Sequence, residues 1–181
     1  LVSSSAASDV YKRQGLFVLI TAFANISGAH LNPFVSLSMY LTKRIKGKEL
    51  LTFIPAQILG CLLGVMLANV FFEHSIIELS TKNRDGFHIF LSEIVATFGL
   101  IFIIFATLKD GKTTVAACVA TYISAGYWFT SSTSFANPAV AIARTFTDSF
   151  TGINYLNTPT YIFAELLGAI VAVYIIKRLI K

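Results

Sequence analysis

The chain has 181 residues, of which 55% are apolar and only 13% are charged, and its mean hydropathy is +0.73. An ordinary soluble domain carries about 25% charged residues, so this composition excludes a soluble globular protein and with it most soluble enzymes. The net charge of +5 does not indicate nucleic-acid binding, because membrane chains keep Lys and Arg in their cytoplasmic loops. We therefore predict an integral protein of the lipid bilayer with no nucleic-acid partner.

The first 14 residues, LVSSSAASDVYKRQ, differ in composition from the apolar sequence that begins at Gly15. They contain no initiator Met and no apolar core of the kind that a signal peptide needs. They resemble a translated adapter remnant. We therefore expect residues 1–14 to be a non-native tail, and residues 15–181 to form a single domain whose first helix and part of whose second helix are missing.

Apolar segments along the chain predict the membrane helices. A bilayer core about 30 Å thick needs roughly 20 residues of helix to cross it. The segment at residues 15–26 is too short, which fits a helix cut by the start of the fragment. Longer segments predict membrane-spanning helices at residues 50–72, 87–108, 113–129 and 158–176.

Two further segments, at residues 33–41 and 138–147, run for only nine and ten residues. Each is about 15 Å of helix, or half the thickness of a membrane. Each begins with Pro and follows Asn, and this pair is favourable at a helix start because Asn caps the helix and Pro fits its first position. We predict two half-helices.

Lys and Arg residues are distributed unevenly between the two sides that these helices define. Twelve lie outside residues 1–14: nine at 43–48, 109–112 and 177–181, and then Lys82, Arg84 and Arg144. If these nine residues are cytoplasmic, successive spans cross the membrane in alternating directions, and nine cations lie inside against three outside. This distribution obeys the positive-inside rule. We predict an external loop at residues 73–86 and a cytoplasmic C-terminus.

The chain contains an internal repeat. The sequences NPFV at residues 32–35 and NPAV at 137–140 lie 105 residues apart, and AQxxG at 56–60 and AExxG at 164–168 lie 108 apart. The two copies are expected to have opposite orientations, as in other inverted-repeat membrane proteins. Broken helices at membrane depth are tolerated only inside protein or around a water-filled cavity. Two half-helices that enter from opposite faces and meet at the midplane therefore predict a pore.

The two loops SGAHLNP (27–33) and FANPA (135–139) resemble the signature loops of the major intrinsic protein family, the aquaporins and aquaglyceroporins. The resemblance implies an all-α membrane protein, an inverted repeat of six helices and two half-helices, in a homotetramer whose subunits each hold a pore. The first repeat would be represented by residues 15–72 and the second by residues 87–181.

The resemblance assigns roles to individual residues. The pore centre would comprise Asn32, Pro33, Phe34, Asn137, Pro138 and Ala139. The two Asn side chains either cap the half-helices alone or also donate hydrogen bonds to a passing molecule, which the positive helix ends would orient. His30 would line the cytoplasmic half of the pore or only brace its loop.

Acidic residues inside membrane spans are functional or structurally paired. The resemblance implies that Glu93 braces the loop around Asn137, with its carboxylate accepting hydrogen bonds from backbone N–H groups of that loop. The alternative is a proton-coupling role for Glu93. Gln57 and Glu165 occupy equivalent positions in the two repeats and are expected to brace loops or to join helix packing. Small residues at Gly60, Gly64, Gly99 and Gly168 would permit close helix crossings.

The sequence departs from the family pattern at the selectivity constriction. Water-selective members place Arg after the second Asn-Pro-Ala and His twelve residues before its Asn, where this chain has Val140 and Ala125. The third constriction position matches Ser134. A small, apolar constriction predicts a pore wider than a water filter.

Arg144 follows Val140 by one helical turn. It either replaces part of the missing charge at the outer mouth or complements the half-helix C-terminus and pairs with Asp148. The sequence from NPAV to TDSF (137–150) resembles bacterial family members associated with arsenic resistance.

These features predict a passive channel for small neutral solutes, namely glycerol-like polyols, arsenite and water, in the plasma membrane, here a bacterial inner membrane. The alternatives are a water-selective aquaporin and an ion-coupled carrier with broken helices. No recognisable spacing of catalytic groups supports an enzyme. We expect no cofactor and no metal, and we interpret Cys61 and Cys118 as core residues.

Overall fold

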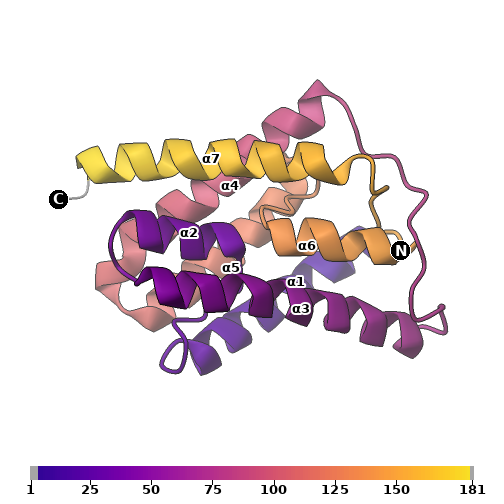
Figure 1. The fold of residues 1–181 in the computed structure, drawn as a ribbon, viewed down its shortest axis with the longest axis horizontal. Coiled ribbons are helices and arrows are strands. Elements are labelled where there is room, and N and C mark those ends of the chain that lie inside the picture. Colours follow the sequence, from indigo (N-terminus) through magenta and orange to yellow (C-terminus); the bar gives the residue numbers. More distant parts are fainter. Residues whose placement is uncertain (1–3, 180–181) are drawn as a thin grey trace.

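The computed structural model describes the backbone of residues 4–179 and the side chains of residues 13–179. This part of the chain is helical and contains no strand, which confirms the predicted all-α membrane fold (Figure 1). Its elements are α1 (Ser4–Phe23), α2 (Pro33–Leu41), α3 (Gly47–Phe71), α4 (Phe87–Thr107), the 3-10 helix η1 (Leu108–Asp110), α5 (Lys112–Phe129), α6 (Pro138–Ala143), the 3-10 helix η2 (Arg144–Phe146) and α7 (Thr158–Leu179).

Three of these helical segments are long and apolar enough to cross a membrane, namely Gly47–Phe71, Phe87–Asp110 and Thr158–Leu179. Their bounds lie within a few residues of the predicted spans. The fourth predicted span, α5, has 18 residues and a more polar start, since Lys112, Thr113 and Thr114 occupy its first turn.

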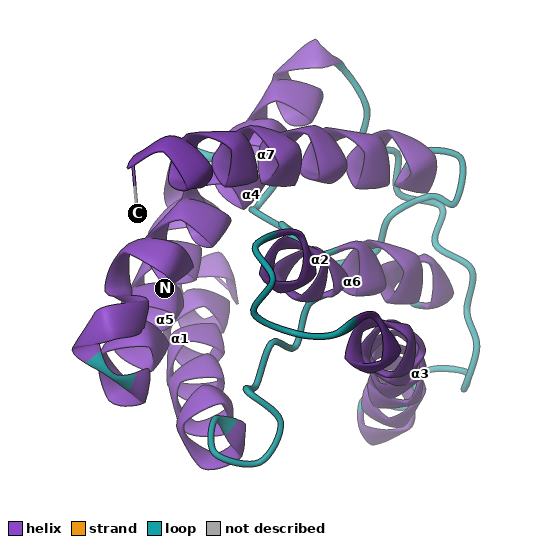
Figure 2. Cartoon of the chain, turned by 60° about the vertical axis from the view of Figure 1, so that its left-hand side comes forward, coloured by secondary structure: helices purple, strands orange, loops and turns teal. Residues whose placement is uncertain are grey.

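The two half-helices lie inside the molecule. α2 and α6 follow one another across the middle of Figure 1, and the longer helices surround them in Figure 2. Both half-helices pack against α3 and α7, while α4 packs along α7 and α1 along α5. Each half-helix therefore contacts helices of both repeats, as an inverted repeat requires.

Two predicted helices differ from the structure at one end. The first helix was expected from Gly15, whereas α1 begins at Ser4 and is continuous through that point; the origin of residues 1–14 stays a prediction. The second half-helix was expected to reach Thr147, but α6 ends at Ala143 and continues as η2. The hydroxyl of Thr145 donates to the carbonyl of Ile142 at 2.7 Å, so the last turn tightens.

Small residues allow close packing where α4 crosses α7 and where α4 crosses α5. A Cβ atom at Gly168 of α7 would meet the backbone oxygen of Ile94 in α4, and one at Gly99 would meet the hydroxyl of Tyr122. By contrast, Gly60 and Gly64 in α3 have open space around the same position. The expected role in close crossing therefore holds for Gly99 and Gly168 but not for the two glycines of α3.

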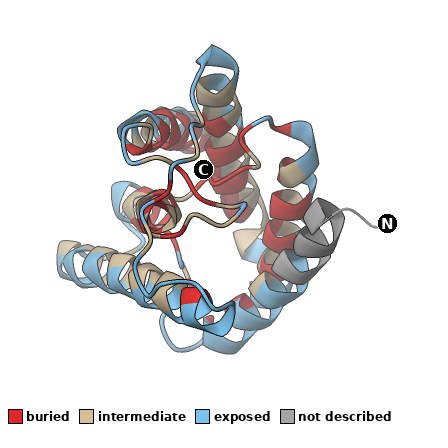
Figure 3. Ribbon diagram, turned by 90° about the vertical axis from the view of Figure 1, so that its right-hand side faces the viewer, coloured by how far each residue is buried: buried red, intermediate tan, exposed pale blue. Residues whose placement is uncertain are grey.

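The buried residues gather around the half-helices (Figure 3). A large apolar cluster joins α1, α2, α4, α5 and α7, and a smaller one joins Phe135, Ala141, Ile153 and Tyr161. The smaller cluster lies beside α6 and fixes the loop that leads into it. The core thus holds the two broken elements in place.

Candidate functional site

Each half-helix starts at an Asn that caps it. The backbones of Asn32 and Asn137 are extended, with φ of −158° and −160°. The Oδ1 atom of Asn32 accepts from the backbone N–H of Phe34 at 2.9 Å, and Oδ1 of Asn137 accepts from that of Ala139 at 3.1 Å. Pro33 and Pro138 follow at the first helical positions. The predicted capping role of both Asn residues is therefore confirmed.

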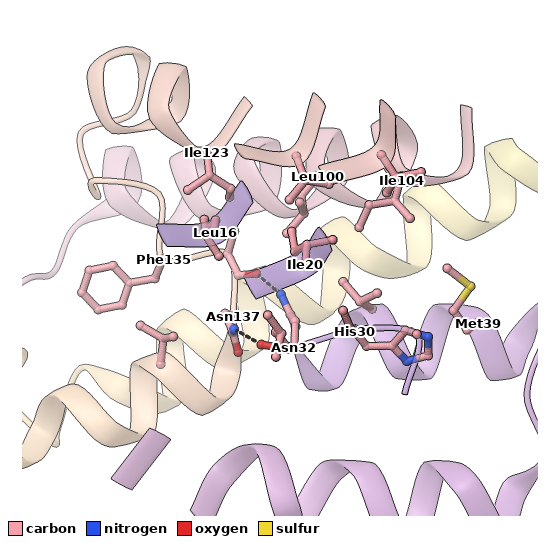
Figure 4. A pocket seen from close by; sticks show the side chains of 18 of the residues that line it. Leu16, Ile20, His30, Asn32, Met39, Leu100, Ile104, Ile123, Phe135 and Asn137 are labelled. Carbon is pink, nitrogen blue, oxygen red and sulfur yellow. Dashed lines mark hydrogen bonds between the residues drawn. The ribbon is translucent and has the colours of Figure 1, made fainter. Parts of the chain in front are cut away.

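The two Asn side chains also join the loops to each other. Nδ2 of Asn32 donates to the backbone oxygen of Ala136 at 2.6 Å, and Nδ2 of Asn137 donates to that of Leu31 at 2.8 Å (Figure 4). The N-termini of the two half-helices therefore face one another. Each amide group carries two hydrogens, so one on each Asn is left for a second acceptor. Donation to a passing molecule stays a prediction.

The two loops share one backbone conformation. Positive φ occurs at Gly28, Ala29 and Leu31 before α2, and at residues 133, 134 and 136 before α6. Every pair is separated by 105 residues, so the repeat extends to the individual backbone torsions. Positive φ is unfavourable for residues other than Gly, and such strain persists only where the surroundings hold it.

Glu93 holds the second loop. Its side chain is fully buried, and its two carboxylate oxygens accept from the backbone N–H groups of Phe135 at 2.9 Å and Ala136 at 2.7 Å. Oε1 of Glu165 accepts from the next one, that of Asn137, at 2.9 Å. Three consecutive N–H groups are thus bound by two buried carboxylates. These are the contacts that the expected bracing role of Glu93 requires, and Glu165 adds a third; the bracing role itself stays a prediction.

The first loop is held by a chain of polar side chains. Nε2 of Gln57 donates to Oγ of Ser36 at 2.9 Å, and Oγ of Ser36 lies 3.0 Å from Nδ1 of His30. The His30 ring also meets Phe53 edge-on, with ring centroids 5.4 Å apart. His30 therefore braces its loop. It also lines the cavity described next; a role in the cytoplasmic half of a pore stays a prediction.

A cavity of about 180 Å³ runs past the point where the half-helices meet. One wall carries Asn32, Asn137 and His30, and the facing wall carries aliphatic residues of three other helices (Figure 4). These aliphatic residues include Leu16, Ile20, Leu100, Ile104, Val119 and Ile123. A second cavity of about 280 Å³ adjoins it at His30 and Met39 and extends to Lys112 and Arg44. The first cavity therefore has a polar wall and an apolar wall.

The predicted constriction residues lie in different places. Val140 and Arg144 line the cavity, whereas Ala125 and Ser134 are not among its lining residues. Ser134 is fully buried, next to Gly126, where an added Cβ would lie 2.7 Å from its Oγ. Ile123 faces the cavity instead of Ala125, because two residues turn a helix by about 200°. A constriction role for Ala125 and Ser134 stays a prediction.

Sequence reasoning missed the aliphatic wall. On α5 the lining residues are Val115, Val119 and Ile123, which recur every four residues and so share one helix face. That spacing was visible in the sequence, but the same pattern also describes a helix face in the core. Only the packing of the half-helices against this face distinguishes the two.

Arg144 stacks on an aromatic ring at one end of the cavity. Its Cζ atom lies 4.2 Å from the centroid of Phe135, which packs on Tyr161 at 4.8 Å, and Arg84 lies 5.7 Å from the same ring. This places a positive charge beside Val140. Arg84 is anchored by donating to the backbone oxygens of Gly152 at 2.9 Å and Phe150 at 2.7 Å.

The expected pairing of Arg144 with Asp148 is wrong. Asp148 instead lies 3.5 Å from Nζ of Lys82 and accepts from the backbone N–H of Thr81 at 2.9 Å. That hydrogen bond, together with the Lys82 charge, lowers the pKa of the Asp148 carboxyl below its ordinary value. Asp148 therefore joins the two loops on this face, and Arg144 stays with the cavity.

Comparison with known proteins identifies the family. The sequence profile of the family described as "Major intrinsic protein" matches residues 7–127. The chain is 43% identical over 166 residues to "Aquaglyceroporin AqpS" of Rhizobium meliloti (strain 1021), covering 92% of this chain and 71% of that protein. It is 27% identical to "Aquaporin-4" of Homo sapiens over 85% of this chain, and spans half of that relative's length. It is also 33% identical to "Probable aquaporin TIP2-2" of rice, Oryza sativa subsp. japonica, over 54% of this chain and 40% of that protein.

The profile match covers most of the chain, and the first of these relatives is similar over nearly all of it. The two matched half-helices and the reciprocal bonds between their Asn caps are in agreement with that similarity. The chain therefore belongs to the major intrinsic protein family of membrane channels.

Proposed function

We propose that the chain forms a passive transmembrane pore for small neutral solutes: water, glycerol-like polyols, and uncharged metalloid hydroxides such as arsenous acid. The observation that carries the proposal is the cavity at the meeting point of the half-helices, which combines Asn32 and Asn137 with Val140 and an aliphatic wall. A polyol has hydroxyl groups on one side for the amide donors and carbon on the other for the apolar wall. The name of the aquaglyceroporin relative supports the same solute class.

Charge at the pore centre favours neutral solutes. Each helix N-terminus carries about half a positive charge, so the two facing ends present about one in all. The Arg144 guanidinium adds a full charge at the end of the cavity near Val140. A cation would have to pass both at membrane depth, where moving a charge is costly. Arsenous acid is uncharged near neutral pH and avoids this cost.

The width of the pore follows from Val140. Arg at this position would place fixed donors and a long side chain in the passage and would favour water. Val supplies neither donors nor a long side chain. Arg144, one helical turn after Val140, is held against the ring of Phe135. The water-selective alternative therefore requires a narrowing elsewhere.

An ion-coupled carrier is the alternative from another class. It needs an acidic group at membrane depth that is available to a coupling ion. Glu93 and Glu165 are the buried acidic residues of the described chain, and both bind backbone N–H groups of the second loop. A bracing role accounts for both oxygens of Glu93 and for Oε1 of Glu165, so we favour the channel.

We further propose a homotetramer in a bacterial inner membrane, with the C-terminus in the cytoplasm and residues 15–181 as the channel domain. The nine cations at residues 43–48, 109–112 and 177–181 support this orientation. With it, Val140 and Arg144 lie toward the outer mouth and His30 toward the inner one.

Flux through reconstituted vesicles tests the proposal. Shrinkage and swelling are followed by stopped-flow light scattering with glycerol and then arsenous acid as the permeant, with and without ion gradients. We expect flux that is proportional to the solute gradient and indifferent to ions. Flux that saturates and follows a proton or sodium gradient would show a carrier instead.

A further inference from the structure

We propose that the chain binds the phosphate headgroup of an anionic phospholipid in a basic cavity formed by the ends of α2, α4 and α7. The cavity measures about 250 Å³ and is lined by Leu41, Thr42, Lys43, Arg44, Phe105, Ile176 and Lys177. It shares Arg44 with the cavity that adjoins the pore, but its other lining residues are different, and the proposal does not depend on the solute. The proposed orientation places it at the cytoplasmic leaflet.

Three cations from two parts of the sequence surround an apolar floor. Lys43 and Arg44 follow α2, and Lys177 lies in the last turn of α7. The floor is made by Phe105 and Ile176, each only 3% exposed. Cζ of Arg44 lies 5.5 Å from the centroid of the Phe105 ring, which holds the guanidinium at the rim.

The charge of this cavity is not cancelled by the protein. The C-terminal ends of α2, α4 and α7 lie here, and each contributes about half a negative charge. Together they neutralise about half of the three cations. The lining contains no acidic residue, and Lys43, Arg44 and Lys177 form no ion pair within residues 13–179. The excess of about 1.5 positive charges is enough to neutralise the single negative charge of one phosphodiester.

A lipid fits the surroundings better than a free anion does. The cavity lies where membrane helices end, and anionic lipids concentrate at the cytoplasmic surface, where basic pockets between helices bind their headgroups. Tyr174, one turn before Lys177, is 58% exposed. The outer face of α7 therefore offers an acyl chain an apolar path that leads away from the headgroup.

Lipid retention measured by native mass spectrometry tests the site. The full chain is released from mixed micelles that contain phosphatidylglycerol and phosphatidylcholine in equal amounts. We expect wild type to retain one phosphatidylglycerol in preference to phosphatidylcholine. Each of Lys43→Gln, Arg44→Gln and Lys177→Gln should weaken this retention about fivefold, since one Lys or Arg near a lipid surface contributes that much.

Lys48→Gln is the matched control, because Lys48 belongs to the same basic segment but does not line the cavity. It should retain the lipid as wild type does, and so should Lys177→Arg, which keeps the charge. The mutated side chains are exposed, and circular dichroism of each variant checks that its helices are intact. Equal losses in Lys48→Gln, or no loss in the cavity variants, would overturn the proposal. Displacement of the lipid by excess inorganic phosphate would also overturn it, by showing a free-anion site.

Discussion

Replacing Glu93 by Gln should destabilise the fold by removing one of the three carboxylate hydrogen bonds that hold the second loop. Glu93 is fully buried and accepts two backbone N–H groups, at 2.9 and 2.7 Å. Gln keeps one acceptor and turns an N–H₂ donor toward the other N–H group. The change therefore removes one hydrogen bond to a charged group and leaves a buried donor unsatisfied.

The expected cost is about 2.5–6 kcal/mol, because hydrogen bonds to charged groups contribute about 1.5–3 kcal/mol and an unsatisfied buried donor costs about 1–3 kcal/mol. The loop also relies on this support to keep residues 133, 134 and 136 at positive φ. For a chain of this size, about 1 kcal/mol lowers the melting temperature by 2–4 °C. We therefore expect the melting temperature to decrease by about 5–24 °C.

Thermal unfolding of the purified protein in detergent, followed by intrinsic fluorescence, measures this change. Glu165→Gln should cost less, because one of its oxygens binds a single loop N–H group, that of Asn137. Glu78→Gln is the control in an exposed loop, where Glu78 contacts His74, and it should melt as wild type does. A Glu93→Gln protein that melts within about 1 °C of wild type would refute the bracing role.

Three other changes test separate parts of the account. Asn137→Asp should reduce solute flux into vesicles at least tenfold, since it puts a charge at the pore centre and removes the donor to Leu31. The control Asn154→Asp should conduct normally, because Oδ1 of Asn154 only accepts from Leu156. Equal flux through the two variants would show that Asn137 does not lie in the pore. Gly168→Ala should lower the free energy of unfolding by about 1–3 kcal/mol, because it overpacks the crossing of α7 and α4. The control Gly60→Ala meets open space and should leave the stability unchanged or increase it. Equal melting temperatures of the two variants would contradict that packing. The lowered pKa of Asp148 means that its carboxylate stabilises the contact between its own loop and residues 80–82 above its ordinary pKa of 3.8. This effect is lost as the pH falls through the folded pKa. Proteolysis of these two loops should therefore increase below about pH 4 in wild type and change less with pH in Asp148→Asn.

The elements that the sequence predicted well are those with strong local signals. The Asn-Pro pairs defined the starts of α2 and α6 to the residue, because capping and the missing Pro N–H act within one turn. The capping of both half-helices therefore depended on chemistry that a few neighbouring residues determine. The contacts of Glu93 are different, because its partners Phe135 and Ala136 lie 42 and 43 residues away, and they were expected from the family pattern alone.

The elements that the sequence predicted poorly depend on distant contacts. Asp148 contacts Thr81 and Lys82 and not the nearby Arg144, because the loop at residues 73–86 lies against it. The spacing of residues along a helix cannot predict such a contact. Arg144 stacks on Phe135 for the same reason. The position of Ala125 on α5 likewise follows from how the helix is rotated against the half-helices, which no count along the sequence determines.

The central claim is that Val140 leaves the pore wide enough for polyols and arsenous acid. Its most direct test is the ratio of glycerol to water permeability in proteoliposomes of wild type and Val140→Arg, measured by stopped-flow light scattering on the same preparation. We predict that the variant loses most of its glycerol and arsenous-acid permeability while it still conducts water. Identical ratios in the two proteins, with wild type excluding both larger solutes, would contradict the claim and favour a water-selective channel.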